Sequence, residues 1–328
     1  MKAIAYRQTG PAAEVLQLVD LPVPEPGPGE VRVRVRWSGV NPSDVKSRAG
    51  LRTKTLAFPQ IVPHSDGAGE IDAVGPGVPS ARVGQSVWLW NGAWQRAHGT
   101  AAQAVVLPAA QAVPLPEGVP GEAAACLGIP ALTALHAVLM DGGVAGKRVL
   151  VAGGAGAVGH YAVQFARQLG AAQVVATVSS EAKAQLARAG GADATIDYKR
   201  EDLVARAMAL TAKSGFDRVV EVDAAANLAS DLNLLAPGGD VVIYGSGAAE
   251  IALPFFAAIV RNATLRCFIV YNLAGADRER AIATLTPMLA RGALQHNIAE
   301  RLPLADCARA HEIVESGRAI GNVVLRID

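Results

Sequence analysis

The sequence predicts an α/β protein with a β-rich part followed by a doubly wound part that contains a parallel sheet. Residues 31–35 alternate apolar and charged side chains with a period of two, which is typical of a strand with one face in solvent. From about Glu122 onward, β-branched runs alternate with helical patterns, which is typical of parallel βαβ units. Hydrophobic residues make up 51% of the chain but aromatic residues only 5%, so Ala, Val, Leu and Ile must form most of the core.

The β-rich part comes first. The chain has 328 residues, a length that favours two domains of ordinary size over one large domain. A Pro/Gly-rich turn segment precedes its longest apolar run. Turn residues separate the runs that follow, which indicates an antiparallel arrangement. The turn segment is expected at residues 22–30, and strands at 31–40, 67–75 and 83–90.

The alternating part repeats a strand-then-helix pattern, and each apolar run is short enough for a buried strand. Strands are expected at residues 149–152, 174–179, 218–223 and 240–247, and helices up to residue 170, at 181–190 and at 227–239. The end of the chain predicts two further helices and a closing strand, at residues 278–291, 306–316 and 322–327.

Charge and cysteine usage exclude several classes of function. Thirty basic and 29 acidic residues leave a net charge of +1, which gives no basic footprint for nucleic acid or an anionic membrane. The three cysteines, Cys126, Cys267 and Cys307, have no paired spacing, which predicts neither a disulfide framework nor a thiolate metal cage. We therefore expect small-molecule partners and a reducing, cytoplasmic location.

Two segments have features that bear on export or on membrane insertion. The opening MKAIAYRQTG lacks the apolar region of a secretory signal. Residues 123–140 carry no charged side chain over a length that can span a membrane, but Gly128 and Pro130 interrupt them. We interpret this stretch as a buried loop and a core helix.

A glycine-rich loop follows the first strand of the alternating part. It satisfies the pattern G-x-G-x-x-G, with a strand before it, a helix after it and a second strand further on. The first glycine is expected to allow a tight turn, the second the approach of a pyrophosphate, and the third close packing of helix on strand. A turn without a ligand is the alternative, and the context favours a dinucleotide. The loop consists of Gly154, Ala155, Gly156, Ala157, Val158 and Gly159.

The end of the second strand bears on the choice of dinucleotide. An NAD site usually places an acidic residue there for the ribose 2′-hydroxyl, whereas this chain has Ser179 and Ser180, followed by Lys183. Two hydroxyl donors and a cation at a helix start suit a 2′-phosphate, although Glu181 opposes it. A serine N-cap with a solvated lysine is the alternative. We expect NADPH as the cofactor.

Six segments spread over nearly the whole length make the chain resemble the zeta-crystallin-like quinone oxidoreductases, zinc-independent members of the medium-chain dehydrogenase/reductase superfamily. The segments are GVNPSD at 39–44, DGAGEIDAVGPGV at 66–78, LGIPALTALHA at 127–137, AGGAGAVG at 152–159, TIDYKRED at 195–202 and VVEVDAAANL at 219–228. The resemblance implies a GroES-like catalytic domain, a Rossmann cofactor domain and NADPH in the cleft. The implied boundaries are 1–121 and 268–328 for the catalytic domain and 122–267 for the Rossmann domain.

The resemblance also implies roles for individual residues. Asn41 matches a residue beside the nicotinamide and substrate, and Thr133 a threonine at the nicotinamide; taken alone, they read as a turn former and a core-helix residue. The remaining implied cofactor positions follow the cofactor from one end to the other. They are Ala155, Gly156, Ala157 and Val158 at the pyrophosphate, Ser179, Lys183 and Tyr198 at the 2′-phosphate, Asn227 near the ribose, the fifth-strand loop Tyr244, Gly245, Ser246 and Gly247, and a strand Phe268, Ile269 and Val270 that closes over the carboxamide.

One departure from the family concerns the third candidate catalytic residue, Lys46. Many relatives carry a tyrosine five positions after the asparagine, and this chain has Lys46 there. Either the substrate carries an anionic or carbonyl group near Lys46, or Lys46 is solvated, as most lysines are. Tyr271 is a candidate for the vacated role.

The positions that hold catalytic zinc in related dehydrogenases indicate a metal-free protein. Those enzymes have Cys, His and Cys where this chain has Asn41, Ser65 and Ile129, none of which is a usual zinc ligand. His64 lies one residue away and is expected to face the other side of an extended chain.

Without a Lewis acid, an activated acceptor is favoured over an alcohol, which predicts NADPH-dependent hydride transfer to a quinone. Asn41 is the candidate hydrogen-bond donor, and a bound water the proton source. Reduction of an activated C=C bond in enones, enals or enoyl thioesters is the first alternative, and a non-catalytic NADPH-binding protein the second. We find no Ser/His/Asp set for hydrolysis, and we expect a homodimer or homotetramer.

Overall fold

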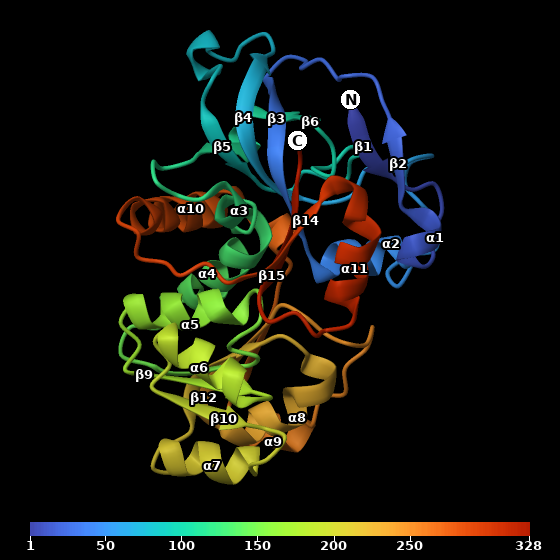
Figure 1. Ribbon diagram of the computed structural model, residues 1–328. Helices are drawn as coiled ribbons and strands as arrows, with labels where there is room; N and C mark the ends of the chain where they lie inside the picture. The colour runs from blue at the N-terminus through green and yellow to red at the C-terminus, as the bar shows by residue number, and fades with distance from the viewer. The chain divides into compact units, whose positions relative to one another are not determined.

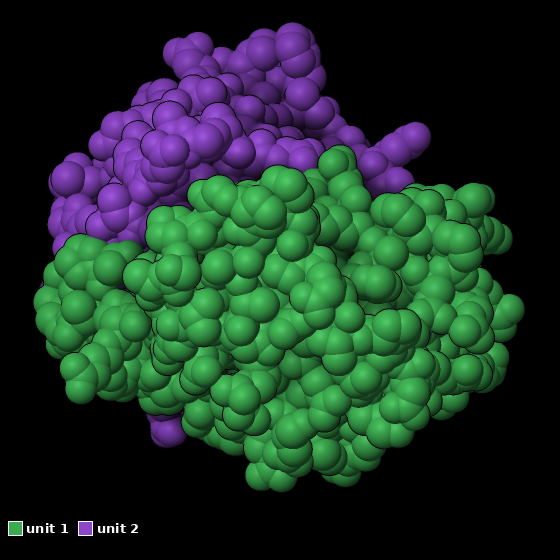
Figure 2. Space-filling model, turned by 90° about the horizontal axis from the view of Figure 1, so that it is seen from above, with its two compact units in different colours: residues 1–130, 286–328 green, residues 131–285 purple.

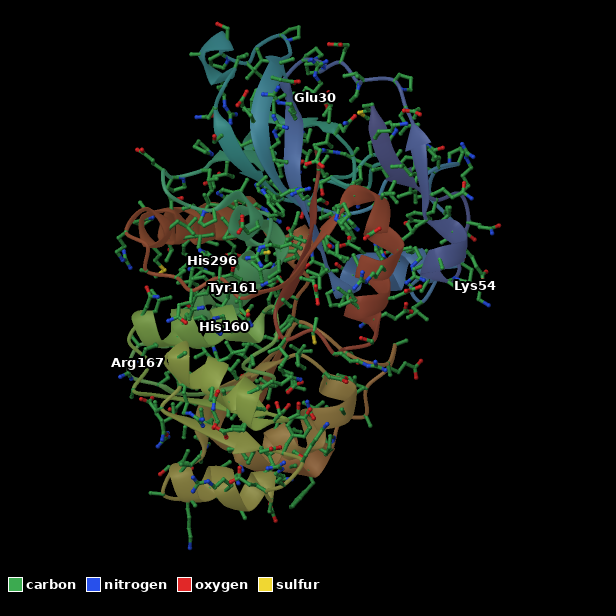
Figure 3. The ribbon with its side chains drawn as sticks, in the orientation of Figure 1. Glu30, Lys54, His160, Tyr161, Arg167 and His296 are labelled. Atoms are coloured by element: carbon green, nitrogen blue, oxygen red, sulfur yellow. The ribbon has the colours of Figure 1, made fainter.

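The computed structural model describes residues 1–328, which form two compact units (Figure 2). Unit 1 comprises residues 1–130 and 286–328, and unit 2 comprises residues 131–285. The boundaries between the units lie after residues 130 and 285, later in the chain than the domain boundaries expected after residues 121 and 267. Helix α3 (Gly121–Ala124) packs against strands of unit 1, and the turn at Val270–Asn272 packs against a helix of unit 2, which accounts for the shift.

Unit 1 is built on a seven-stranded sheet. Its strands pair antiparallel, apart from the parallel pair of β14 and β15 near the end of the chain. A further antiparallel pair, β1 (Lys2–Ala5) and β2 (Gln17–Asp20), lies outside this sheet. The order across the seven-stranded sheet is β14 (Ile298–Pro303), β15 (Asn322–Arg326), β3 (Glu30–Val40), β4 (Asp66–Val74), β5 (Ser86–Leu89) and β7 (Ala112–Pro114), and β6 (Ala104–Pro108) pairs with β3.

Strand β3 shows the predicted alternation. Val31, Val33 and Val35 lie in the core of unit 1, where they are at most 1% exposed. Arg32 and Arg34 point the other way and form ion pairs with acidic residues of β4. The three predicted strands of the first part are therefore confirmed as β3, β4 and β5, the last of which begins at Ser86 after the 3₁₀ turn Ser80–Arg82.

The helices of unit 1 are short and cover one end of the sheet. They are α1 (Ala12–Val15), α2 (Pro42–Arg48), α3 and α11 (Cys307–Glu315), with 3₁₀ turns at Ala109–Gln111 and Leu304–Asp306. Helix α11, red in Figure 1, packs against α1, α2 and β15. The predicted helix near 306–316 and the closing strand are thus confirmed as α11 and β15. No helix of either unit has both the length and the apolar character needed to cross a membrane.

Unit 2 contains a six-stranded sheet in which every neighbouring pair is parallel. The strand order reverses between β8 and β11, which is the Rossmann arrangement, and ligands bind at the carboxyl ends of the strands beside such a reversal. The order is β10 (Ala194–Asp197), β9 (Gln173–Val178), β8 (Arg148–Val151), β11 (Phe216–Glu221), β12 (Leu235–Ile243) and β13 (Thr264–Cys267).

Helices connect these strands and cover the sheet of unit 2, as Figure 1 shows from green to orange. Since parallel crossovers are right-handed, the reversal places α5 and α6 on one face and α8 on the other. The helices are α4 (Leu132–Leu139), α5 (Gly159–Gln168), α6 (Glu181–Ala189), α7 (Leu203–Leu210), α8 (Ala224–Leu234), α9 (Phe255–Val260) and α10 (Gly275–Ala290).

The uncharged stretch at 123–140 is confirmed as buried backbone, because every residue from 123 to 138 is buried. Its local structure is more specific than a loop and a helix. A π-helical turn, Leu127–Ala131, contains Pro130 and leads directly into α4. Turns of this kind are rare and are frequent at functional sites.

Candidate functional site

The glycine loop of unit 2 joins β8 to α5 and is fastened to β9. The Gly153 N–H donates to Thr177 Oγ1 at 3.0 Å, and the Gly154 N–H donates to the Thr177 carbonyl oxygen at 3.0 Å. Gly153 has φ of 65°, a left-handed conformation that glycine adopts without strain. The tight turn expected at Gly154 therefore falls on Gly153, and sequence reasoning missed both Gly153 and Thr177.

The other three glycines of the loop differ in their surroundings. Packing requires glycine at two of them, and the third has open space beside it. A Cβ on Gly154 would lie 2.4 Å from the Cβ of Ala176, and one on Gly159 would lie 2.2 Å from the Gly153 oxygen. A Cβ on Gly156 would meet only the Gly153 oxygen, at 3.3 Å. The backbone at Gly156 is therefore open beside the start of α5, where helix N–H groups attract a phosphate. This geometry fits a pyrophosphate.

A polar corner lies at the carboxyl ends of β9 and β10. Lys183 Nζ donates to Ser179 Oγ at 3.1 Å, and Ser180 Oγ accepts from the Lys183 backbone N–H at 3.4 Å. The Tyr198 N–H donates to the Val178 oxygen at 3.1 Å, which places Tyr198 beside Ser179, with 51% of its surface exposed. Ser179, Ser180, Lys183 and Tyr198 are called the phosphate corner below.

The acidic residue that opposes a phosphate at this corner is compensated. Glu181 forms an ion pair with Arg188, about two turns further along α6, and Arg188 also donates to Thr195 Oγ1 at 3.0 Å. The carboxylate is thereby held on the outer side of the helix. Its opposition to a 2′-phosphate is weaker than the sequence suggests, because a paired charge contributes less field.

The loop after β12 is tied to the end of β11. The Gly247 N–H donates to Asp223 Oδ1 at 2.7 Å, and the Tyr244 N–H donates to the Glu221 oxygen at 3.1 Å. Asn227 Nδ2 donates to Glu221 Oε1 at 3.0 Å, so its amide faces inward. Burial and the nearby charge of Glu221 raise the pKa of the Tyr244 phenol. The structure thus groups Tyr244, Gly245, Ser246 and Gly247 with Asn227 at one end of the sheet.

The segment Phe268–Val270 differs from the expected strand. Strand β13 ends at Cys267, Phe268 and Ile269 have no strand pairing of their own, and a 3₁₀ turn begins at Val270. The Arg278 guanidinium donates to the Val270 oxygen at 2.6 Å, where the turn begins. Phe268 packs edge-on against His136, with ring centroids 4.7 Å apart.

Helix α4 carries Thr133, which is 5% exposed. A fully buried residue of β11, Arg218, holds the end of this helix. Its guanidinium donates to the Ala137 oxygen at 3.1 Å and the Met140 oxygen at 3.0 Å, and pairs with Asp240 at 2.7 Å. A cation at helix carbonyls is favourable. Sequence reasoning missed Arg218, although an arginine inside a buried strand was the available signal.

Asn41 is the centre of the candidate site in unit 1. It precedes α2 as its N-cap, is 4% exposed, and its backbone N–H donates to Asp44 Oδ2 at 2.8 Å. Its side-chain Nδ2 donates to Asp66 Oδ2 at 2.8 Å. The Asn41 amide is therefore held in one orientation by a carboxyl group that sequence reasoning did not single out.

Asp66 is fully buried at the start of β4. A Cβ on Gly128 would lie 2.6 Å from Asp66 Oδ1, and a Cβ on Gly39 would lie 2.9 Å from the Asp66 Cβ, so two glycines make room for this carboxyl group. Burial raises the pKa of Asp66 well above its usual value, while the bond from Asn41 opposes the rise. The available signal was an acidic residue directly before the glycines of the β4 motif.

The donor set at the zinc positions does not fit zinc. The Asn41 amide presents an N–H₂ group to Asp66, Ser65 is 3% exposed, and Ile129 has no donor atom in its side chain. Tetrahedral zinc needs thiolate, imidazole or carboxylate ligands. His64 has φ of 77°, so the chain is not extended there as expected. Its ring nitrogens lie within hydrogen-bond distance of Ser38 and His311 instead.

The other catalytic candidate, Lys46, and the candidate replacement for the missing tyrosine, Tyr271, lie in different units. Lys46 is half-buried on α2 of unit 1, and Tyr271 is 7% exposed in the turn after β13 of unit 2. The roles of Asn41, Lys46, Thr133 and Tyr271 at a substrate stay predictions.

Comparison with known proteins supports this reading of both units. The family model described as "Alcohol dehydrogenase GroES-like domain" matches residues 27–117, and that described as "Zinc-binding dehydrogenase" matches residues 157–289. A quinone oxidoreductase of Pseudomonas aeruginosa is 32% identical over 319 residues, which are 95% of each chain. A 2-haloacrylate reductase of a Burkholderia species is 30% identical over 299 residues, 88% of this chain and 87% of that protein.

Two solved structures are similar over nearly the whole chain. One is described as an NAD-dependent alcohol dehydrogenase, with a TM-score of 0.92, 33% identity and full coverage of both chains. The other is Escherichia coli quinone oxidoreductase in complex with NADPH, with a TM-score of 0.88, 26% identity and coverage of 99% and 100%. The protein therefore belongs to the zeta-crystallin-like quinone oxidoreductases, oxidoreductases of the medium-chain dehydrogenase/reductase superfamily.

Proposed function

We propose that the protein transfers a hydride from NADPH to a quinone without a metal ion. The observation that carries the choice of cofactor is the phosphate corner, where two hydroxyls and Lys183 meet at the end of β9, and β9 itself ends at Val178, followed by the two serines and not by an Asp or Glu. An Asp or Glu in that place would bind a ribose 2′-hydroxyl and repel a 2′-phosphate. The cofactor is therefore NADPH, as in the Escherichia coli relative.

The chain's own backbone supplies the remaining contacts to the cofactor. The open Gly156 backbone and the start of α5 receive the pyrophosphate, and Tyr198 offers a ring face beside the adenosine. The loop from Tyr244 to Gly247 and the segment from Phe268 to Val270 border the same end of the sheet. When bound, the cofactor supplies the hydride from C4 of its nicotinamide.

The acceptor oxygen needs a donor where negative charge develops. Hydride addition to a quinone gives a hydroquinone anion, and one proton completes the reaction: NADPH, a proton and the quinone give NADP⁺ and the hydroquinone. The Asn41 amide has two N–H groups, and Asp66 occupies one of them. The second orients and stabilises the acceptor oxygen, and a bound water delivers the proton.

Metal independence is part of this proposal. It is supported by the donor set at Asn41, Ser65 and Ile129, which does not fit a zinc ion. We expect the purified protein to be active, and we expect elemental analysis of the same sample to find less than one zinc per chain. Loss of activity on chelation, restored by zinc alone, would contradict the proposal.

A second candidate reaction is the reduction of an activated C=C bond in an anionic acceptor. The observation that favours it is Lys46, a cation five positions after Asn41 where many relatives have a tyrosine, together with the 2-haloacrylate reductase among the relatives. The missing tyrosine weakens the version that uses enoyl thioesters. Lys46 suits a carboxylate next to the double bond.

A panel assay distinguishes the reactions. Loss of NADPH absorbance is followed with ortho-quinones, para-quinones, enones, 2-haloacrylates and enoyl thioesters at equal concentration. Quinone reduction is supported if a quinone gives the highest kcat/KM, and C=C reduction if an acrylate or enone does. Tight NADPH binding without turnover of any acceptor would identify a non-catalytic binding protein.

We also propose a homodimer that forms through unit 2. Strand β13 is the edge of the six-stranded sheet, so one side of its backbone lacks a strand partner. Beside it, α9 exposes four large apolar side chains, Phe255, Phe256, Ile259 and Val260, between 47% and 76% of whose surfaces are in solvent. A second copy covers both the open edge and the apolar helix. Size-exclusion chromatography with light scattering tests this, and a monomer at all concentrations would contradict it.

A further inference from the structure

Two imidazoles and a thiol meet in the core of unit 1, beneath α11. Cys307 and His311 are four residues apart on this helix, so their side chains lie on the same face. His64 approaches them from the segment before β4. All three side chains are fully buried, at 0% exposure.

The three donor atoms are close enough to share one ligand. His64 Nε2 lies 2.9 Å from His311 Nε2 and 3.9 Å from Cys307 Sγ, and all three atoms lie within 4.8 Å of one another. Metal–nitrogen bonds of about 2.0 Å and metal–sulfur bonds of about 2.3 Å place the donor atoms of a trigonal site about 3.5–3.8 Å apart. Small rotations of the two rings and the thiol reach that arrangement.

A chain of hydroxyl groups fixes the tautomer of His64. Thr100 Oγ1 donates its proton to the Asp66 carbonyl oxygen, so it must accept from Ser38 Oγ, which lies 2.8 Å away. Ser38 has then used its own proton and must accept from His64 Nδ1 at 2.9 Å. His64 therefore carries its proton on Nδ1 and turns the lone pair of Nε2 toward His311 and Cys307.

When no metal ion is bound, two donors compete for the single lone pair of His64 Nε2. His311 Nε2 must donate its N–H to His64 Nε2, and the Cys307 thiol points at the same atom. His311 Nδ1 is then a buried acceptor without a hydrogen-bond partner. Burying a polar group without a partner costs free energy, so hydrogen bonds alone do not satisfy the polar atoms of this cluster.

We propose that His64, Cys307 and His311 bind one Cu(I) ion. The ion takes the place of the proton between the two imidazoles and of the thiol proton. On binding, the Cys307 S–H bond breaks and its proton leaves to solvent, while the His311 proton moves from Nε2 to the vacant Nδ1. No electron is transferred, and the entering and leaving positive charges balance.

Charge and coordination number favour Cu(I) over Zn²⁺. Thiolate and imidazole ligands are soft enough for Cu(I), and three of them satisfy it. Zn²⁺ with one thiolate would leave a net positive charge in a buried site and would need a fourth ligand, whereas the cluster offers three donor atoms and all three residues are 0% exposed. The widely spaced cysteines gave no sign of a thiolate site, because its other ligands lie 247 residues apart in the chain.

The three donor atoms are distinct from the groups proposed for hydride transfer: they bond to one another and to Ser38, whereas the Asn41 side chain bonds to the Asp66 carboxyl group. The site is therefore tested by metal binding and not by turnover. Failure of the quinone assay would leave the copper proposal standing, and failure of copper binding would leave the cofactor proposal standing.

The experiment uses the full chain with the other cysteines replaced, Cys126→Ser and Cys267→Ser, so that no other thiol binds copper. Cu(I) is supplied without oxygen as its acetonitrile complex, and bicinchoninate competes for it. Loading is attempted on the folded protein and again during refolding, because the site is buried. X-ray absorption then reports the ligands of the bound ion.

We expect about one Cu(I) per chain, with a ligand shell of two nitrogens and one sulfur. Adding Cys307→Ser or His311→Gln should weaken binding at least about a hundredfold, as loss of a ligand does, whereas His98→Gln on the surface should not. Saturating Cu(I) should raise Tm by about 5 °C. No binding by either loading route, binding unaffected by Cys307→Ser, or a site that accepts Zn²⁺ but not Cu(I) would overturn the proposal.

Discussion

The nucleotide loop of unit 2 and the Asn41 site of unit 1 are built in different ways. At the loop, the proposed cofactor contacts depend on the backbone: Gly153 turns the chain, and Gly154 and Gly159 leave no space for a side chain. At Asn41, the proposed role depends on a side chain whose direction is fixed by another side chain, Asp66. A backbone site fails when an atom is added, whereas a side-chain site fails when an atom is removed.

The largest effect is expected from removing an atom group at the side-chain site. Asn41→Ala should lower kcat/KM by about ten- to a thousandfold, because one positioned donor at the developing oxyanion is lost. NADPH affinity should stay nearly the same, since the phosphate corner and the loop are unchanged. Steady-state kinetics with a fluorescence titration of NADPH separates the two quantities.

Asp66→Asn sharpens this prediction by testing the partner of Asn41. If Asp66 only orients the amide, kcat should fall and Asn41→Ala should add little to the double variant, because the two residues act as a unit. Equal kcat/KM in wild type and Asn41→Ala would mean that Asn41 serves only as the N-cap of α2.

Adding one atom at the backbone site should have the next largest effect. In Gly159→Ala the new Cβ would lie 2.2 Å from the Gly153 oxygen, so the loop must move. A shift of this size should weaken NADPH binding by about a hundredfold. The measurement is the same titration, with NADH as a second ligand, and both cofactors should lose affinity because they share the pyrophosphate.

Gly275→Ala is the matched control for this loop variant. Its Cβ would meet nothing within 4 Å, and its φ is not in the left-handed region. Binding of NADPH and Tm should both stay close to the wild-type values. If Gly159→Ala behaves like Gly275→Ala, the loop does not hold the pyrophosphate.

Lys183→Ala removes a single charge from the phosphate corner and should have a smaller effect. A partly exposed charge-assisted contact contributes about 1–3 kcal/mol, so NADPH should bind about ten- to a hundredfold more weakly. NADH should be unaffected because it lacks the 2′-phosphate. Titrations at two salt concentrations check the mechanism, since screening should weaken NADPH binding more than NADH binding.

Lys147→Ala serves as the control for charge, because Lys147 lies at the amino end of β8, whereas the phosphate corner lies at the carboxyl ends of the strands. It should leave the ratio of NADPH to NADH affinity unchanged. Equal affinity of the wild type for both cofactors would show that Ser179 to Lys183 do not form a 2′-phosphate site.

The contrast between the two sites also explains what the sequence predicted. The alternation at Val31 to Val35, the strand-helix repeats and the glycine loop are local patterns, and the structure confirms the elements they predict. Asp66 and Arg218 act through partners far along the chain, at Asn41 and Ala137, and no local pattern marks such a pair. The resemblance implied a strand over Phe268 to Val270, but β13 ends at Cys267 and a 3₁₀ turn begins at Val270, whose oxygen accepts from Arg278.

A last prediction concerns stability and not cofactor binding, through a buried carboxyl group of α8 that has an acidic neighbour on β11. Burial, and secondarily the charge of Glu221, raise the pKa of Asp231 to about 9. Because the folded pKa lies above the unfolded value of 3.8, Asp231 favours folding below pH 3.8, and this contribution is lost as the pH rises through 9. The loss is at most about 1.4 kcal/mol per pH unit.

Asp231→Asn should therefore flatten the fall in the free energy of unfolding between pH 6 and 9, whereas Glu250→Gln on the surface should not. Denaturant unfolding at several pH values measures this. Parallel pH profiles for wild type and Asp231→Asn would show that Asp231 is ionised in the folded protein.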